Sequence, residues 1–134
     1  MILNLIRNAI EAMSEVTEGS RELVIGTSRA EADGVLGAAS DSGPGLPRAN
    51  PERVFEAFCT TKASGLGVGL SIRRPIVEAH GGRLWAARNE PHGAVICLVL
   101  PMGKNRLRIW SHLRHKFRQM ANAIGRALGS VGSF

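Results

Sequence analysis

Apolar side chains near the start of the chain recur at helical spacing. Leu3, Ile6, Ile10 and Met13 are three or four residues apart, which predicts an α-helix over residues 2–13. These four side chains make one stripe along that helix.

Four later segments predict β-strands. Residues 22–28 and 35–40 are apolar runs on either side of a polar turn, and they predict one strand pair. Residues 83–88 and 94–100 predict a second pair, joined by a turn over residues 89–93 and ended by a proline.

Two shorter segments separate the strand pairs. Residues 51–58 predict a short helix that begins at a proline, and residues 69–80 predict a longer one that ends at Gly81 and Gly82. Residues 60–67 between them predict a loop. The order of helix, two strands, helix and two strands predicts an α+β fold, a two-layer α/β sandwich whose mixed sheet is covered by helices on one face.

Asn4 and Asn8 lie one turn apart on a different face of the first helix. Two neutral amides at this spacing can direct carbonyl oxygens toward one point. Oxygen ligands suit Mg²⁺, which shares its coordination shell with phosphates and water. The alternative is that the amides only bond to nearby backbone, and an isolated pair of this kind favours that interpretation.

A second group of polar and small residues follows the first strand pair. Asp41 ends a strand, and its carboxylate can accept a hydrogen bond from an amino group such as that of adenine. Gly43 and Gly45 let the backbone pass close to a flat ligand. Asp, Ser, Gly and Pro are also ordinary turn formers, so a simple turn is the alternative.

A glycine-rich segment, residues 65–69 (GLGVG), leads directly into a predicted helix. Its backbone amides and the positive end of the helix dipole suit phosphate groups, and Lys62 adds a nearby charge. The pattern alone is weak evidence, because no strand precedes it as in a dinucleotide-binding loop.

Taken together and in order, these segments resemble the nucleotide-binding boxes of sensor histidine kinases, in the superfamily that also includes gyrase, Hsp90 and MutL. The resemblance runs from about residue 2 to Pro101. The matching segments are the N box (4–13, NLIRNAIEAM), the G1 box (41–46, DSGPGL), the F box (54–58, VFEAF), the lid and G2 box (60–62, TTK, and 65–72, GLGVGLSI) and the following helix-to-strand junction (78–85, EAHGGRLW).

The resemblance implies a Bergerat-type ATP-binding fold with ATP and Mg²⁺ as ligands. It implies that Asn8 binds Mg²⁺, that Asp41 binds the adenine amino group, and that Phe55 and Phe58 pack at the base of the lid. The residues implied to act in catalysis are Asn4, Asn8 and Lys62. The residues implied to contact the nucleotide are Asn8, Asp41, Gly43, Gly45, Thr61, Lys62, Gly65, Gly67, Gly69 and Leu70.

One position bears on the reaction. Hydrolytic relatives have a glutamate base where this chain has Asn4, and an amide cannot take a proton from water at neutral pH. The resemblance therefore implies phosphoryl transfer to a histidine on a separate dimerisation domain, and then signalling to a response regulator. None of the four histidines has the sequence context of that acceptor: His80, His92, His112 and His115.

Two positions depart from the family pattern and favour alternatives to an active kinase domain. Pro75 falls inside a predicted helix, at a cost of about 3 kcal/mol, and Val95 stands where the family often has a threonine that holds adenine through water. The alternatives are a degenerate module that has lost useful nucleotide affinity and an ATPase of the gyrase or MutL kind, which Asn4 disfavours.

Composition adds limits on location and redox chemistry. The chain has 134 residues, 44% of them hydrophobic, which suffices for one compact domain with a core. No apolar run reaches the length of a membrane span and no signal peptide is apparent, so we expect a cytoplasmic protein. Cys59 and Cys97 are too few for a disulfide framework or a zinc site, and Cys97 fits a small core residue.

The net charge of +6 is concentrated in the last part of the chain. From Lys104 onward there are seven Lys and Arg and no Asp or Glu, which divides the chain into a catalytic domain (1–101) and a basic tail (102–134). The tail carries apolar residues at helical spacing and predicts a C-terminal amphipathic helix. It could lie on an anionic membrane surface or, less plausibly, bind nucleic acid; it could pack on the exposed sheet; or it could have no selected role.

Overall fold

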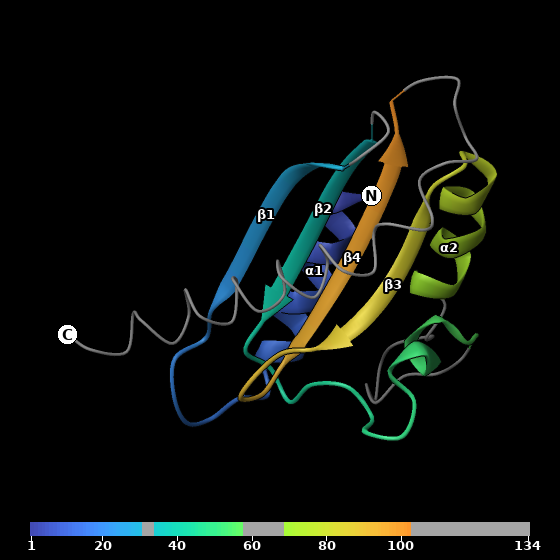
Figure 1. Ribbon diagram of the computed structural model, residues 1–134. Coiled ribbons are helices and arrows are strands. Elements are labelled where there is room, and N and C mark those ends of the chain that lie inside the picture. The colour runs from blue at the N-terminus through green and yellow to red at the C-terminus, as the bar shows by residue number, and fades with distance from the viewer. Residues whose placement is uncertain (31–33, 58–68, 103–134) are drawn as a thin grey trace.

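The computed structural model describes residues 1–30, 34–57 and 69–102. In chain order the described elements are α1 (Ile2–Met13), β1 (Leu23–Ala30), β2 (Gly34–Asp41), the 3₁₀ helix η1 (Pro51–Phe55), α2 (Gly69–Ala79), β3 (Arg83–Arg88) and β4 (Ala94–Pro101) (Figure 1). Both predicted strand pairs are present, as are the helices predicted over residues 2–13 and 69–80. The short helix predicted over residues 51–58 is the 3₁₀ helix η1 over residues 51–55. Within the described ranges, no helix is long and apolar enough to cross a membrane.

The four described strands form one sheet in the order β1-β2-β4-β3, and all three pairings are antiparallel. The prediction of a mixed sheet is therefore wrong for these strands. The chain crosses from β2 through η1 and α2 to β3, a kind of connection that usually joins parallel neighbours. β2 and β3 do run in the same direction, but β4 returns between them and pairs with both (Figure 1).

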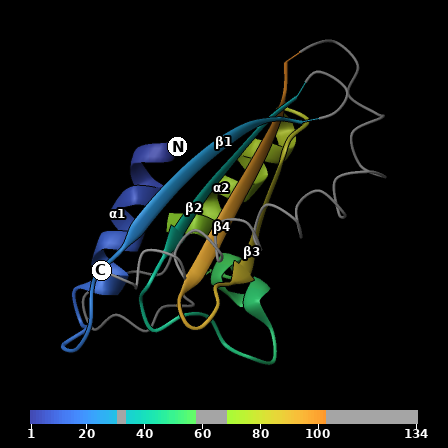
Figure 2. The ribbon, with the colours of Figure 1, turned by 60° about the vertical axis from the view of Figure 1, so that its left-hand side comes forward.

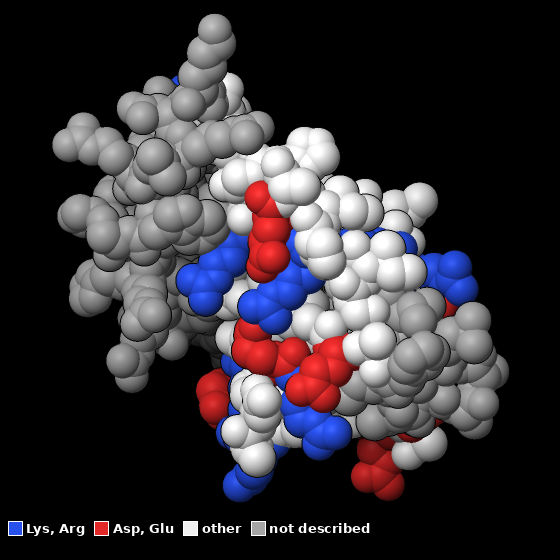
Figure 3. All heavy atoms as spheres, turned by 90° about the vertical axis from the view of Figure 1, so that its right-hand side faces the viewer, with Lys and Arg blue, Asp and Glu red and all other residues white. Residues whose placement is uncertain are grey.

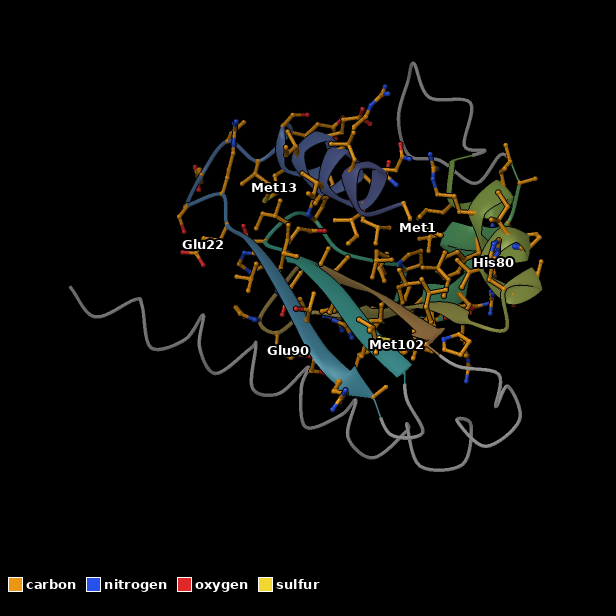
Figure 4. The ribbon with its side chains drawn as sticks, turned by 90° about the horizontal axis from the view of Figure 1, so that it is seen from above. Met1, Met13, Glu22, His80, Glu90 and Met102 are labelled. Atoms are coloured by element: carbon orange, nitrogen blue, oxygen red, sulfur yellow. The ribbon has the colours of Figure 1, made fainter. Side chains whose placement is uncertain are left out.

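Both α-helices cover the same face of the sheet, as predicted. Figure 2 shows α1 on one side of the sheet beside β1 and β2, and Figure 4 shows α1 and α2 on that same side. Leu5 of α1 and Val77 of α2 belong to one buried cluster with Leu84, Ile96 and Leu98 of the sheet. Burial of these side chains stabilises the domain by roughly 1.5–3 kcal/mol each. The two-layer α/β sandwich is thereby confirmed.

The buried face of α1 differs from the predicted stripe. Leu5, Ala9 and Met13 face the core, whereas 76% of Leu3 and 56% of Ile10 are exposed. Of the four side chains in that stripe, only Met13 is buried. The helix carries apolar residues on two sides, and the side with the small Ala9 is the one that lies on the sheet. A small side chain there lets the helix approach β2 closely.

Pro75 lies inside α2, which continues through it without a break. Its side chain is exposed, so packing does not require a proline at this position. We expect Pro75→Ala to raise the free energy of unfolding by about 1–3 kcal/mol, because alanine restores a helical N–H and removes a clash with the preceding turn. Urea unfolding measures the change. Ile76→Ala, at the next exposed position, should change it by less than about 0.5 kcal/mol, and an equal effect of both variants would contradict the strain at Pro75.

Candidate nucleotide-binding site

Asp41 is a buried carboxylate at the end of β2. Its side chain is 5% exposed, and its Oδ1 accepts hydrogen bonds from the backbone N–H of Gly43 at 2.9 Å and of Ala94 at 3.3 Å. Burial raises the pKa of this carboxyl above its usual value, and the two N–H donors partly offset that rise. Its Oδ2 has no hydrogen-bond partner among the described residues. One carboxylate oxygen is thus fixed, and the other is available to a ligand.

Gly43 lies against this carboxylate, and Gly45 lies against Gly93 of the β3–β4 hairpin. A Cβ added at Gly43 would lie 3.0 Å from Oδ1 of Asp41 and 3.4 Å from Cβ of Ala12. Gly45 has a φ of +88°, and a Cβ there would lie 3.0 Å from the carbonyl oxygen of Gly93. A side chain at Gly43 would press on Asp41 and Ala12, and one at Gly45 would press on Gly93, so the close approach of the backbone at both positions requires glycine.

Asn4 and Asn8 lie on the side of α1 that leads toward Asp41. Ala12 follows them at the same four-residue spacing and borders Gly43. With a rise of about 1.5 Å per residue, Asn8 and Asn4 are about 6 and 12 Å further along the helix axis than Ala12. The two amides therefore follow Ala12 in a row along the helix that leads away from Gly43 and Asp41.

The amide of Asn8 fits a Mg²⁺ ion that is held mainly by phosphates. Asn4 and Asn8 are half-buried, and no side-chain hydrogen bond joins either of them to another described residue. An amide oxygen of this kind can fill one position of the octahedral shell that Mg²⁺ prefers. Among the described residues, no group of three or more His, Cys, Asp or Glu side chains could hold a metal ion by itself.

The β3–β4 hairpin supplies two residues that the sequence interpretation missed. Asn89 is 4% exposed, and its Nδ2 donates a hydrogen bond to the carbonyl oxygen of Asp41 at 3.0 Å. Its backbone N–H donates to the carbonyl oxygen of Gly93, which has a φ of +111°. These contacts tie the hairpin to the end of β2. The only signal in the sequence is a turn with Asn and Gly four residues apart, which is common in hairpins.

The same hairpin corrects the interpretation of Val95. Its side chain is 1% exposed and packs with Ala38 and Cys97 on the face of the sheet away from α1 and α2. The preceding residue, Ala94, is the one beside Asp41, because its N–H bonds to Oδ1. Successive residues of a strand point to opposite faces, so a shift of one position exchanges the two environments.

A network of contacts around Glu52 joins η1 to β3 and α2. Asn50 caps η1 by accepting a hydrogen bond from the backbone N–H of Glu52 at 3.1 Å. Glu52 in turn accepts a hydrogen bond from the backbone N–H of Ala86 at 3.1 Å and pairs with Arg74 of α2 at 2.8 Å. Arg74 also lies over the ring of Phe55, 4.8 Å from its centroid. Figure 3 shows basic and acidic side chains intermixed on this surface.

The second half of the predicted site is only partly described. Gly69 and Leu70 form the first residues of α2, and Leu70 packs against the buried cluster under the helices. Phe55 is 8% exposed and belongs to that cluster, so it packs in the core and does not line the surface of the site. The other predicted positions lie outside the described residues: Phe58, Thr61, Lys62, Gly65 and Gly67.

The fold defines a class of protein, a two-layer α/β domain whose helices cover one face of an antiparallel sheet. Comparison with known proteins assigns the family. Residues 1–104 match the model of the histidine kinase-, DNA gyrase B- and HSP90-like ATPases. The chain belongs to this family, and its type is that of the ATP-binding domain of sensor histidine kinases.

Curated sensor proteins resemble the chain over most of its length. It is 45% identical over 101 residues to the sensor protein FixL of Bradyrhizobium diazoefficiens, covering 75% of this chain and 20% of FixL. It is 39% identical over 103 residues to the sensor histidine kinase TmoS of Ectopseudomonas mendocina, covering 76% of this chain and 11% of TmoS. The chain therefore spans a fifth or less of the length of these two relatives.

Solved structures agree with the sequence comparison. The catalytic domain of the histidine kinase ThkA matches with a TM-score of 0.61 and 37% identity, over 75% of this chain and 62% of that one. Full-length ShkA, solved in complex with AMPPNP, matches with a TM-score of 0.63 and 27% identity, over 75% of this chain and 20% of that one.

Proposed function

We propose that residues 1–101 bind Mg-ATP and donate its γ-phosphoryl group to a histidine on another protein segment. The observation that carries this proposal is the buried Asp41, whose Oδ1 is fixed by two backbone N–H groups while Oδ2 has no partner among the described residues. An oxygen in this state suits the amino group of adenine, which donates hydrogen bonds. Gly43 lets the backbone after β2 pass close to the carboxylate without a side chain between them.

The row of amides on α1 indicates how the nucleotide is oriented in the site. With adenine at Asp41, the phosphates extend toward Asn8 and then Asn4. Asn8 would hold Mg²⁺, and bound Mg²⁺ would supply neutralisation of phosphate charge. The proposed contacts with the phosphates also include Lys62 and the glycines at 65, 67 and 69. Thr61 and Leu70 are the remaining proposed contacts with the nucleotide. ShkA in complex with AMPPNP, an ATP analogue, supports a nucleotide as the ligand.

Phosphoryl transfer is favoured over hydrolysis because Asn4 cannot act as a base. A group that activates water must accept its proton, and a neutral amide does not do so at pH 7. The site therefore positions ATP and leaves the nucleophile to a partner. We assign that role to a histidine-containing dimerisation domain, with a response regulator as the next acceptor, in the cytoplasm where ATP is available.

Incubation with γ-labelled ATP, Mg²⁺ and a separately expressed acceptor domain of a sensor histidine kinase tests this function. We expect acid-labile label on the acceptor, as for phosphohistidine, and almost no release of phosphate when the acceptor is omitted. Replacing the acceptor histidine with alanine is the control and should abolish labelling. Steady phosphate release without any acceptor would instead assign the chain to ATPases of the gyrase or MutL kind.

A further inference from the structure

The face of the sheet opposite α1 and α2 is apolar and inaccessible to solvent. Leu36 and Ala38 of β2 are each 3% exposed, and Val95, Cys97 and Val99 of β4 are 0–1% exposed. Their register places them side by side, because Leu36 pairs with Val99 and Ala38 with Cys97. We call these five residues the second face. They form buried clusters that are separate from the core under the helices.

Water is excluded even from a polar group beside the second face. The hydroxyl of Ser40, which pairs with Val95 in the sheet, is fully buried and has no hydrogen-bond partner among the described residues. A hydroxyl at an open sheet surface would be hydrated. The burial of both the apolar side chains and this hydroxyl requires a cover.

Trp85 of β3 packs against these clusters from within the sheet. No described helix covers the second face, because α1, η1 and α2 all contribute to the core on the other face. Residues 31–33 are too few to cover five side chains. Residues 58–68 connect η1 to α2, and both of their ends are therefore on the helical face. The remaining segment of this chain begins directly after β4, at residue 103.

We propose that residues 104–134 cover the second face as an amphipathic helix. The segment carries an apolar residue every three or four positions: Leu107, Trp110, Leu113, Phe117, Met120, Ile124 and Leu128. A helix over residues 107–128 is about 33 Å long, more than the roughly 27 Å of an eight-residue strand such as β4. The residues between Pro101 and Leu107 allow the chain to turn back over the sheet.

The composition of both surfaces suits this contact. Along β2 the second face carries small side chains, such as Ala38, that let a helix approach, while the helix brings large ones such as Phe117. The basic residues of the segment then remain in solvent, where they raise solubility. Residues 104–134 would thus form a third layer of the domain, on the second face of the sheet.

Reactivity of Cys97 with Ellman's reagent tests the proposal. All variants carry Cys59→Ser, so that Cys97 is the only thiol. In the full chain we expect Cys97 to react at least 100-fold more slowly than in a chain that ends at residue 103. Circular dichroism checks that the shortened chain is folded.

A substitution pair in the full chain keeps the test valid if the shortened chain does not fold. Leu113→Ser with Phe117→Ser removes two residues from the apolar stripe and should accelerate labelling at least tenfold. Arg114→Ser with Arg118→Ser changes the adjacent basic positions and should leave the rate unchanged. Equal labelling rates in the full chain and in both substituted chains would overturn the proposal.

A membrane is the competing occupant. Vesicles of phosphatidylglycerol and phosphatidylcholine, added to the full chain, should leave the labelling of Cys97 slow. Tight vesicle binding through residues 104–134, together with rapid labelling of Cys97 before vesicles are added, would assign the tail to a lipid surface instead. Both experiments are independent of nucleotide binding, so they do not depend on the proposed function.

Discussion

Replacing Asp41 with asparagine should weaken the binding of an ATP analogue about 100-fold, a loss of roughly 2.7 kcal/mol. Asparagine keeps one oxygen for the N–H groups of Gly43 and Ala94, so its amide nitrogen takes the place of Oδ2. That nitrogen is a donor and would face the adenine amino group, which is also a donor. The charge-assisted hydrogen bond is replaced by repulsion. Titration with a fluorescent ATP analogue measures the change.

The same variant should leave the fold intact or more stable. Because burial raises the pKa of Asp41 above its unfolded value, its contribution to stability is present at low pH and lost as pH rises through the folded pKa. At neutral pH the ionised side chain therefore lowers stability, and Asp41→Asn removes that cost. Glu18→Gln, at an exposed carboxylate, is the control and should change neither binding nor stability. Unchanged affinity in Asp41→Asn would overturn the adenine assignment.

The preference for one base over another tests whether Asp41 contacts the adenine amino group directly. Inosine triphosphate has a carbonyl oxygen where ATP has its amino group, so Oδ2 of Asp41 should repel it. We expect the wild-type chain to prefer ATP and Asp41→Asn to lose or reverse that preference. Wild-type affinity for ATP should also fall on acidification, at a higher pH than for an ordinary aspartate, because protonation of Oδ2 converts the acceptor into a donor.

Replacing Gly93 with alanine should cost at least about 3 kcal/mol of stability and abolish nucleotide binding. A Cβ at this position would lie 1.9 Å from the carbonyl oxygen of Asp41 and 3.1 Å from Cα of Ser42. Both neighbours are backbone atoms, so no side chain can rotate to relieve the overlap. The hairpin would have to move away from β2, which breaks the hydrogen bond from Asn89 to Asp41.

Two glycines provide matched controls for Gly93→Ala in urea unfolding. Gly19 has a similar positive φ of +88°, but nothing lies within 4 Å of an added Cβ, so Gly19→Ala reports conformational strain alone, about 1 kcal/mol. Gly37 lies within β2 and also has open space around an added Cβ, so Gly37→Ala should be nearly neutral. Equal costs at Gly93 and Gly19 would show that the contact with Asp41 is not the cause.

Local features of the site could be predicted from the sequence. Asp41, Gly43 and Gly45 are neighbours in the chain, and the end of a strand followed by turn residues places them together almost regardless of the rest of the fold. Asn4 and Asn8 share one side of a helix for the same reason. Asn89 and Gly93 could not be predicted, because they are about fifty positions from Asp41 and meet it only through the pairing of β2 with β4.

The sequence by itself determined the elements of this protein, because helical and strand periodicities, turn residues and the order of the nucleotide-binding segments are local properties. Only the tertiary structure decided which side of each element is used. It selected Leu5 and Ala9 over Leu3 and Ile10 in α1, placed β4 between β2 and β3, and turned Val95 away from Asp41. Several faces of these elements are apolar enough to be buried, and the choice among them depends on the fit between surfaces that come together only when the whole domain packs.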